Sequence, residues 1–140
     1  MSNSEEAATH WLPEKYSLSN QTAVVTGGAK GIGGAIVREL MALGCRVVVW
    51  DQDVSAVATV PGKLDAVAVD VTSQEAIEAA EARTASLIGT PDILVNNAGI
   101  QGPTVPLQDY ERSAWDRVIA VNLTAVYAVS RIFVPGMKKR

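Results

Sequence analysis

Four glycines that lie close together give the chain its most informative pattern. They separate a short apolar run, Thr22–Thr26, from a stretch in which apolar residues recur at helical spacing: Gly27, Gly28, Gly31 and Gly33. The first turn of a helix has backbone N–H groups without partners and carries the positive end of the helix dipole, so it can bind a phosphate. Glycine permits a tight turn there and lets a diphosphate reach the backbone. The pattern therefore indicates a phosphate-binding turn, with the alternative that the glycines serve only a sterically tight loop.

A carboxylate follows at the distance expected for a nucleotide site. The glycines at Gly27, Gly31 and Gly33 are spaced T-G-x-x-x-G-x-G, which we interpret as a variant of the common dinucleotide-binding turn. Asp51 ends the next apolar run and stands 18 positions after Gly33. An interval of about 20 is typical of a carboxylate that accepts hydrogen bonds from the adenosine ribose. The alternative is a solvated residue at a strand end.

Asp51 also bears on the choice of cofactor. A carboxylate at the ribose repels the 2′-phosphate of NADP and so favours NAD. Lys30, inside the glycine turn, favours NADP instead. We predict NAD before NADP, because the repulsion acts at the phosphate itself, whereas a lysine in a loop can be solvated.

Amides form the third group of candidates. Asn97, Ala98 and Gly99 end a further apolar run, on the side of the sheet where the glycine turn lies, and we predict that they line the same site. The alternative for this segment is a simple turn. Asn122 is a polar residue in an otherwise apolar helix, so its amide is either satisfied by a structural partner or faces the site, and both alternatives stay open.

Alternating strands and helices must position these groups. The expected strands are Thr22–Thr26, Arg46–Asp51, Asp65–Val69 and Asp92–Asn97. Four helices are expected. The first runs from Ile32 to a stop at Gly44, and the second is a short piece, Val54–Thr59. The third runs from a cap at Thr72 or Ser73 to Leu87, and the fourth begins after a cap at Ser113. The irregular loop from Ile100 to Arg112 should lie over the mouth of the site. This order predicts an α/β fold, a Rossmann-type doubly wound parallel sheet of order 3-2-1-4.

Composition limits the function classes. The chain has 140 residues, 48% of them hydrophobic, and a net charge of −3, which fits one domain and excludes a basic surface for nucleic acid or anionic lipid. We see no apolar run near the ~20 residues that cross a bilayer. The first ten residues, which include the chain's single histidine, His10, do not have the pattern of a secretory signal, so we expect a cytoplasmic protein. We expect a flexible N-terminal lead over 1–19 and one domain over 20–140. We expect Cys45 to be a small buried residue and predict no metal site.

From Leu18 to its last residue the chain resembles the short-chain dehydrogenase/reductase family. The residues that carry the resemblance are Thr26, Gly27, Gly31, Ile32 and Gly33 in the glycine turn, Asp70 and Val71 as the Asp-Val pair, Asn96 to Gly99 as N-N-A-G, and Asn122 in Val-Asn-Leu. The resemblance implies hydride transfer between a nicotinamide and an alcohol or ketone. It also implies that Asp70 and Val71 contact adenine and that Asn122 holds a water in a proton relay.

Part of the family's catalytic pattern does not occur in these residues. The family uses a serine on a fifth strand and Y-x-x-x-K on the following helix. Tyr127 and Arg131 have that spacing with arginine in place of lysine, but they lie on the helix of Asn122 and cannot be the pair. We therefore expect either the cofactor-binding part of a longer dehydrogenase, incomplete at its C-terminal end, or a shortened protein that binds nucleotide or a partner without turnover. The open edge of the fourth strand and the apolar terminal helix should then meet a second copy or the C-terminal half.

Overall fold

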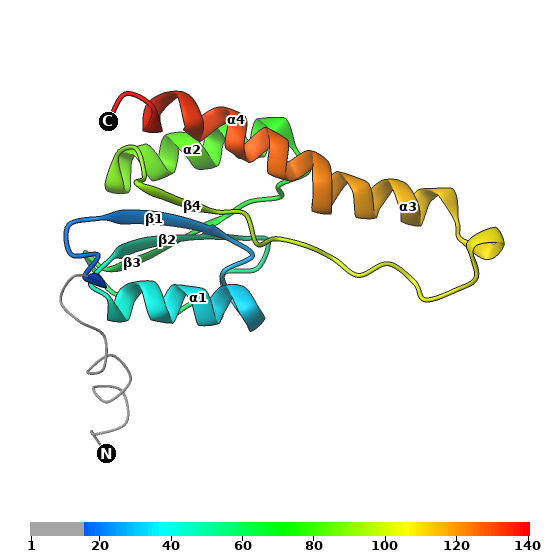
Figure 1. Cartoon of the computed structure of the whole chain (residues 1–140), viewed down its shortest axis with the longest axis horizontal. Helices are drawn as coiled ribbons and strands as arrows, with labels where there is room; N and C mark the ends of the chain where they lie inside the picture. The colour runs from blue at the N-terminus through cyan, green and yellow to red at the C-terminus, as the bar shows by residue number, and fades with distance from the viewer. Residues whose placement is uncertain (1–15) are drawn as a thin grey trace, which may run out of the picture.

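A computed structural model describes residues 16–140 of the chain. A four-stranded parallel sheet lies between helix α1 (Gly31–Ala42) on one face and helices α2 (Gln74–Ile88) and α4 (Ala125–Met137) on the other (Figure 1). Across the sheet the strands lie in the order third, second, first, fourth, which confirms the predicted Rossmann-type order 3-2-1-4. The predicted lead falls mostly outside the described residues, and His10 lies there too. Leu18, within them, donates its backbone N–H to the carbonyl of Leu43 at 2.8 Å.

The strands form where apolar, β-branched residues run together. They are β1 (Thr22–Thr26), β2 (Arg46–Asp51), β3 (Leu64–Ala68) and β4 (Ile93–Val95). Val24 stands opposite Val48 on one side and Leu94 on the other. The third strand begins one residue before its predicted start and ends one residue early, whereas the fourth stops at Val95 instead of Asn97.

Both faces of the sheet are covered, as the unbroken apolar runs predict. On the α2 and α4 face, Trp50 packs against Phe133 with ring centroids 5.2 Å apart, and its indole N–H donates to the buried hydroxyl of Thr84 at 2.8 Å. On the α1 face, Val25, Val49 and the helix residue Val37 form the second core cluster. Two cores on opposite faces hold the strands, and therefore their ends, in fixed positions.

Helices α1 (Gly31–Ala42) and α2 (Gln74–Ile88) end where the sequence predicts. Gly44 has φ +91° and follows α1, and Gly89 caps α2 with φ +71°, both in the left-handed region that favours glycine. Ser73 caps α2 by accepting a hydrogen bond from the N–H of Ala76 at 3.2 Å. Cys45 is buried, as predicted, and burial followed by the charge of Asp92 raises the pKa of its thiol.

Two expectations about helices are wrong. The segment Val54–Thr59 is not a helix, because Asp53 accepts hydrogen bonds from both the N–H and the hydroxyl of Ser55 and forms a local turn there. So short a piece also gains too little to nucleate a helix. Ser113 is not a helix cap, because α3 (Arg112–Ile119) starts one residue before it, after Glu111, without a capping side chain.

Helix α3 continues through a π-helical turn, Ala120–Thr124, into α4 (Ala125–Met137). The buried residues of α4, Ala125, Val129 and Phe133, pack on the sheet, whereas α3 projects past the sheet (Figure 1). By length and composition alone, the helix Arg112–Met137, which contains an 18-residue window of mean hydropathy 1.6, is long and apolar enough to cross a membrane, and it is the only such helix within residues 16–140. This corrects the expectation that nothing in the chain approaches that length. The evidence for a span is weak, since a core helix passes the same test.

Candidate functional site

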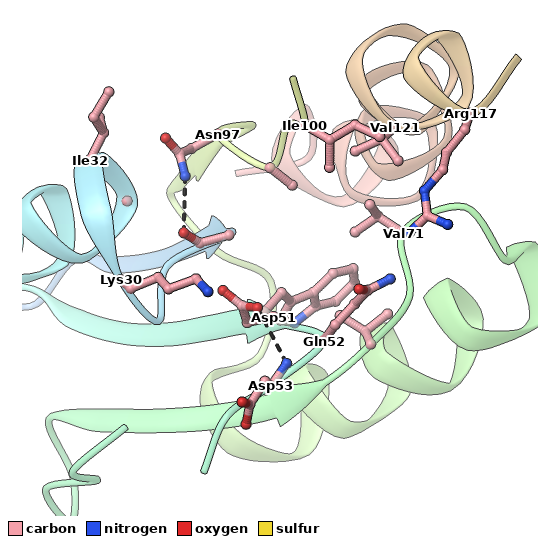
Figure 2. Close-up of a pocket in the computed structure, with 16 residues that line it drawn as sticks. Lys30, Ile32, Asp51, Gln52, Asp53, Val71, Asn97, Ile100, Arg117 and Val121 are labelled. Carbon is pink, nitrogen blue, oxygen red and sulfur yellow. Dashed lines mark hydrogen bonds between the residues drawn. The ribbon is translucent and has the colours of Figure 1, made fainter. Parts of the chain in front are cut away.

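A cavity of about 570 Å³ opens at the carboxyl ends of the strands. Its walls come from the glycine turn after β1, the ends of β2 and β3, the segment after β4 and one side of α3 (Figure 2). This is the point where the strand order reverses between β1 and β4, which is where open α/β sheets bind ligands. The volume lies within the range of small-molecule sites.

The glycine turn forms one wall of the cavity. Gly27 and Gly31 have φ of +64° and +58°, so both adopt the left-handed conformation that the turn requires. Lys30 is the N-cap residue of α1, and its side chain makes no capping hydrogen bond. The first N–H groups of α1 have no intrahelical acceptor, and they are open to an anion beside the cavity. Gly27, Lys30, Ile32 and Gly33 line the cavity, whereas Gly31 does not.

Thr26 and Asn97 fix this turn to the end of β4. The Thr26 hydroxyl accepts hydrogen bonds from the N–H groups of Asn97 and Ala98, both at 3.0 Å. In return, the Asn97 amide donates to the carbonyls of Thr26 and Gly27, both at 3.0 Å. Thr26 is 2% exposed and does not line the cavity, so its hydroxyl supports the turn from behind. Asn97, Ala98 and Gly99 do line it.

Asp51 lies at the rim beside the glycine turn. One carboxylate oxygen accepts from the N–H of Ala29 at 3.1 Å and the other from the N–H of Asp53 at 3.3 Å. These donors fix the carboxylate in place and leave acceptor capacity on both oxygens. Lys30 extends toward Asp51 in Figure 2. Hydrogen bonds from Ser55 lower the pKa of Asp53, and the charge of Lys30 contributes to that shift.

The Asp-Val pair is split between two roles. Val71 lines the cavity, and so does Val69, which precedes the pair, but Asp70 does not. The Asp70 carboxylate accepts from the Thr72 hydroxyl at 2.7 Å and from the Thr72 N–H at 2.9 Å, and these bonds lower the pKa of Asp70. Asp70 therefore shapes the loop that presents Val71.

Asn122 is satisfied by one backbone partner. Its Oδ1 accepts from the N–H of Ile100 at 2.8 Å, and its Nδ2 donates to the carbonyl of Ile100 at 2.9 Å. Of the two open alternatives, the structure shows the satisfied structural amide. Asn122 does not line the cavity, but Ile100 and Val121 do, so its bonds position one wall. The residue lies in the π-helical turn, a feature common at functional sites.

Several lining residues were not predicted from the sequence: Trp50, Gln52, Asp53, Val69, Ile100, Arg117 and Val121. Gln52 could have been found because it follows Asp51 at the strand end. Arg117 and Val121 are four apart on one helix, but nothing in the sequence indicates which face meets the cavity. Of the loop expected over the mouth, only Ile100 lines the cavity, and the chain beyond it runs away from the sheet toward the start of α3 (Figure 1). Within residues 16–140 no cluster of metal-ligating side chains occurs.

One side of the molecule remains uncovered. Within the described chain, β4 pairs only with β1, so its other edge is open. Leu123 and Tyr127, at the junction of the π-helical turn and α4, are each 63% exposed, and Val134 is 43% exposed. The described chain therefore has both an unpaired strand edge and exposed apolar side chains, two features that are typical of surfaces used for contacts.

Comparison with known proteins gives a consistent result. A family model described as short chain dehydrogenase matches residues 21–140. The 2-dehydro-3-deoxy-L-rhamnonate dehydrogenase (NAD(+)) of a Sphingomonas species is 37% identical over 122 residues, 85% of this chain and 49% of that protein. The chain spans about half the length of the curated relatives it matches.

Solved structures agree in fold. The 3-ketoacyl-(acyl-carrier-protein) reductase of Brucella melitensis, complexed with NADH, superimposes with a TM-score of 0.80 at 31% identity, over 85% of this chain and 51% of that one. A metagenomic short-chain oxidoreductase in complex with NADP gives a TM-score of 0.79 at 41% identity, over 86% of this chain and 57% of that one.

Proposed function

The chain belongs to the short chain dehydrogenase family, and we propose on that basis that it is the cofactor-binding part of an NAD-dependent oxidoreductase acting on a secondary alcohol or ketone. The observation that carries the proposal is the cavity at the strand ends, where an uncapped helix N-terminus and a fixed carboxylate border one space.

The residues present fit an adenine dinucleotide. The uncapped N–H groups at the start of α1 suit the diphosphate, because they are donors at the positive end of the helix. Asp51 suits the ribose hydroxyls, which are donors. Val69 and Val71 offer an apolar wall for the base, and Asn97 to Gly99 line the path from the glycine turn toward α3.

Asp51 supports NAD over NADP. Its carboxylate is fixed by two backbone donors, so it cannot easily turn away from a 2′-phosphate. Lys30 acts in the opposite direction, but as a flexible cation. One solved relative is described with NADH and another with NADP, which supports a nicotinamide dinucleotide without choosing between them.

The cofactor choice is tested by D51A, with NAD and NADP affinities measured by titration calorimetry. We expect weaker NAD binding and little change for NADP, because the variant removes the ribose acceptor and the repulsion together. D109A, an exposed carboxylate outside the cavity, is the matched control and should bind NAD as the parent chain does. An equal loss of both affinities in D51A would contradict the assigned role.

When bound, a nicotinamide supplies or accepts the hydride, and the groups described here hold and orient it. Asn122 fixes the Ile100 backbone at the cavity wall, and we propose that it also holds a water of the proton relay that the family resemblance implies. The Y-x-x-x-K pair does not occur among the 140 residues. We propose that this pair lies in the part of the relatives' length that this chain does not match.

The alternative to an enzyme is a module that binds nucleotide without turnover. The two are separated by intact mass and by nicotinamide absorbance on a panel of sugar acid, steroid and acyl thioester alcohols. A longer chain that contains Y-x-x-x-K and turns over supports the enzyme. NAD binding by a 140-residue chain without turnover supports the module, and robust turnover by that chain would defeat our account of the proton donor.

We further propose that either a second copy or the C-terminal half covers the open edge of β4 and the exposed side of α4. The exposure of Leu123 and Tyr127 supports this. Molecular mass in solution tells the two apart, since only a second copy doubles the mass of the 140-residue chain. A monomeric 140-residue chain in solution would exclude the second copy.

A further inference from the structure

Arg117 places a cation in the cavity that the proposed function leaves without a role. It lies on α3, one helical turn before Val121, and both residues line the cavity. In Figure 2 the Arg117 side chain descends from the helix toward Val71, with Gln52 beyond it. The guanidinium therefore lies at the end of the cavity away from the glycine turn, where Val71 forms the apolar wall.

Arg117 is not engaged elsewhere in the described chain. Arg112 pairs with Asp116 on the same helix, Arg46 pairs with Asp65, and Arg140 pairs with Asp92. Arg117 has no such ion pair within residues 16–140, and its charge contributes to the lowered pKa of Asp70 only after the hydrogen bonds of Thr72 and Gln52. The guanidinium is thus free to meet a ligand.

The shape and chemistry of this end suit a flat aromatic ring. Valine side chains on one wall offer apolar contact, and a planar guanidinium on the opposing element stacks on π-systems more readily than an ammonium does. The acidic groups Asp51 and Asp53 lie at the end of β2, so a ribose bound there would extend its base toward Val71 and Arg117.

We propose that Arg117 binds the adenine base by stacking its guanidinium on the ring, which closes the base-binding end of the cavity from α3. This inference rests on the proposed function, since it presumes that an adenine dinucleotide occupies the cavity. It adds a recognition residue on α3, an element to which neither the glycine turn nor the Asp-Val pair belongs.

The experiment compares R117A and R117K by titration calorimetry with NAD and NADP. R117K keeps the charge but loses the planar group, so stacking predicts that both variants lose about three- to tenfold in affinity for both dinucleotides. R131A, on the exposed side of α4 outside the cavity, is the matched control and should bind as the parent chain does. Urea unfolding of each variant checks the fold, and R117Q, which keeps a polar side chain of similar reach, replaces R117A if R117A unfolds early.

The outcomes separate the inference from the function beneath it. Full affinity in R117K would overturn stacking and leave only charge. A loss in R117A confined to NADP would overturn it in favour of a 2′-phosphate contact. Unchanged binding in R117A and R117Q would overturn it while NAD binding by the parent chain upholds the proposed function. Failure of the parent chain to bind either dinucleotide would overturn both.

Discussion

Replacing Thr26 with valine tests how the glycine turn is held at the cavity. The two side chains have nearly the same shape, so T26V removes a hydroxyl without opening a void. That hydroxyl accepts hydrogen bonds from the N–H groups of Asn97 and Ala98, each at 3.0 Å, and Thr26 is 2% exposed. The variant therefore leaves two N–H groups without their acceptor beside a buried methyl group.

The structure sets the size of the effect. A buried donor that loses its partner costs about 1–3 kcal/mol. Because Asn97 and Ala98 both border the cavity, water can partly replace the lost acceptor, so we expect a loss of about 1–3 kcal/mol in the free energy of unfolding. T26S is the matched control, since it keeps the hydroxyl and loses one methyl group, worth about 1 kcal/mol.

Urea unfolding followed by circular dichroism measures the free energy of unfolding of the parent chain, T26V and T26S. NAD affinity by calorimetry gives a second readout, which should fall in T26V because the turn loses its tie to β4. If T26V proves as stable as T26S, the hydroxyl does not carry the connection and our account of the turn is wrong. If the unfolding free energy falls with urea concentration at the same slope in each variant, only the stability has changed.

Two further predictions concern the elements around the cavity. In G33A the new Cβ would lie 2.1 Å from the carbonyl oxygen of Gly27, so we expect a loss of about 1–3 kcal/mol in unfolding free energy and weaker NAD binding. In G34A the nearest atom is 3.6 Å away, so this neighbour should gain about 0.5–1 kcal/mol, and equal urea midpoints for the two variants would refute the packing argument. T72V removes one hydrogen bond to Asp70, so the pKa of Asp70, measured by NMR titration, should rise toward its ordinary value. Since the pKa of Asp70 is lowered in the folded state, the carboxylate stabilises the fold above about pH 4, and this stabilisation is lost as the pH falls through the folded pKa. The loss of unfolding free energy in acid should therefore be smaller in T72V. An unchanged pKa of Asp70 in T72V would contradict this prediction.

The fold could be predicted because its strongest signals are local. Val24 and Val48 lie in unbroken apolar runs, which occur where both faces of a strand are buried, and the alternation with helices then restricts the topology to few parallel orders. Gly44 and Gly89 mark helix ends because their left-handed backbone suits glycine. The failed helix at Val54–Thr59 shows the limit of such signals, since a few residues with helical spacing cannot overcome a turn formed by Asp53 and Ser55.

The site could be predicted only where a motif fixes the backbone. The turn at Gly27 and the carboxylate at Asp51 both border the cavity as their spacing implies. The partner of Asn122 could not be predicted, because its hydrogen bonds to Ile100 depend on a π-helical turn, and no residue pattern in the helix predicts such a turn. Arg117 was missed for a related reason, since the direction of a long side chain on a helix that projects past the sheet depends on tertiary packing.

The bonds between Thr26 and Asn97 also explain why a cavity exists at this place. The β1–β4 register ends with Val25 opposite Val95, and a longer ladder would next bring together the backbones of Thr26 and Asn96. Instead, the carbonyl of Thr26 accepts a hydrogen bond from the Asn97 side-chain amide, and the Thr26 hydroxyl accepts hydrogen bonds from the backbone N–H groups of Asn97 and Ala98. Side chains thus replace the ladder at the residues where the strands separate, so β4 stops at Val95 and the chain turns toward Ile100. The stability of the strand ends and the opening of the cavity between them therefore depend on the same pair of residues.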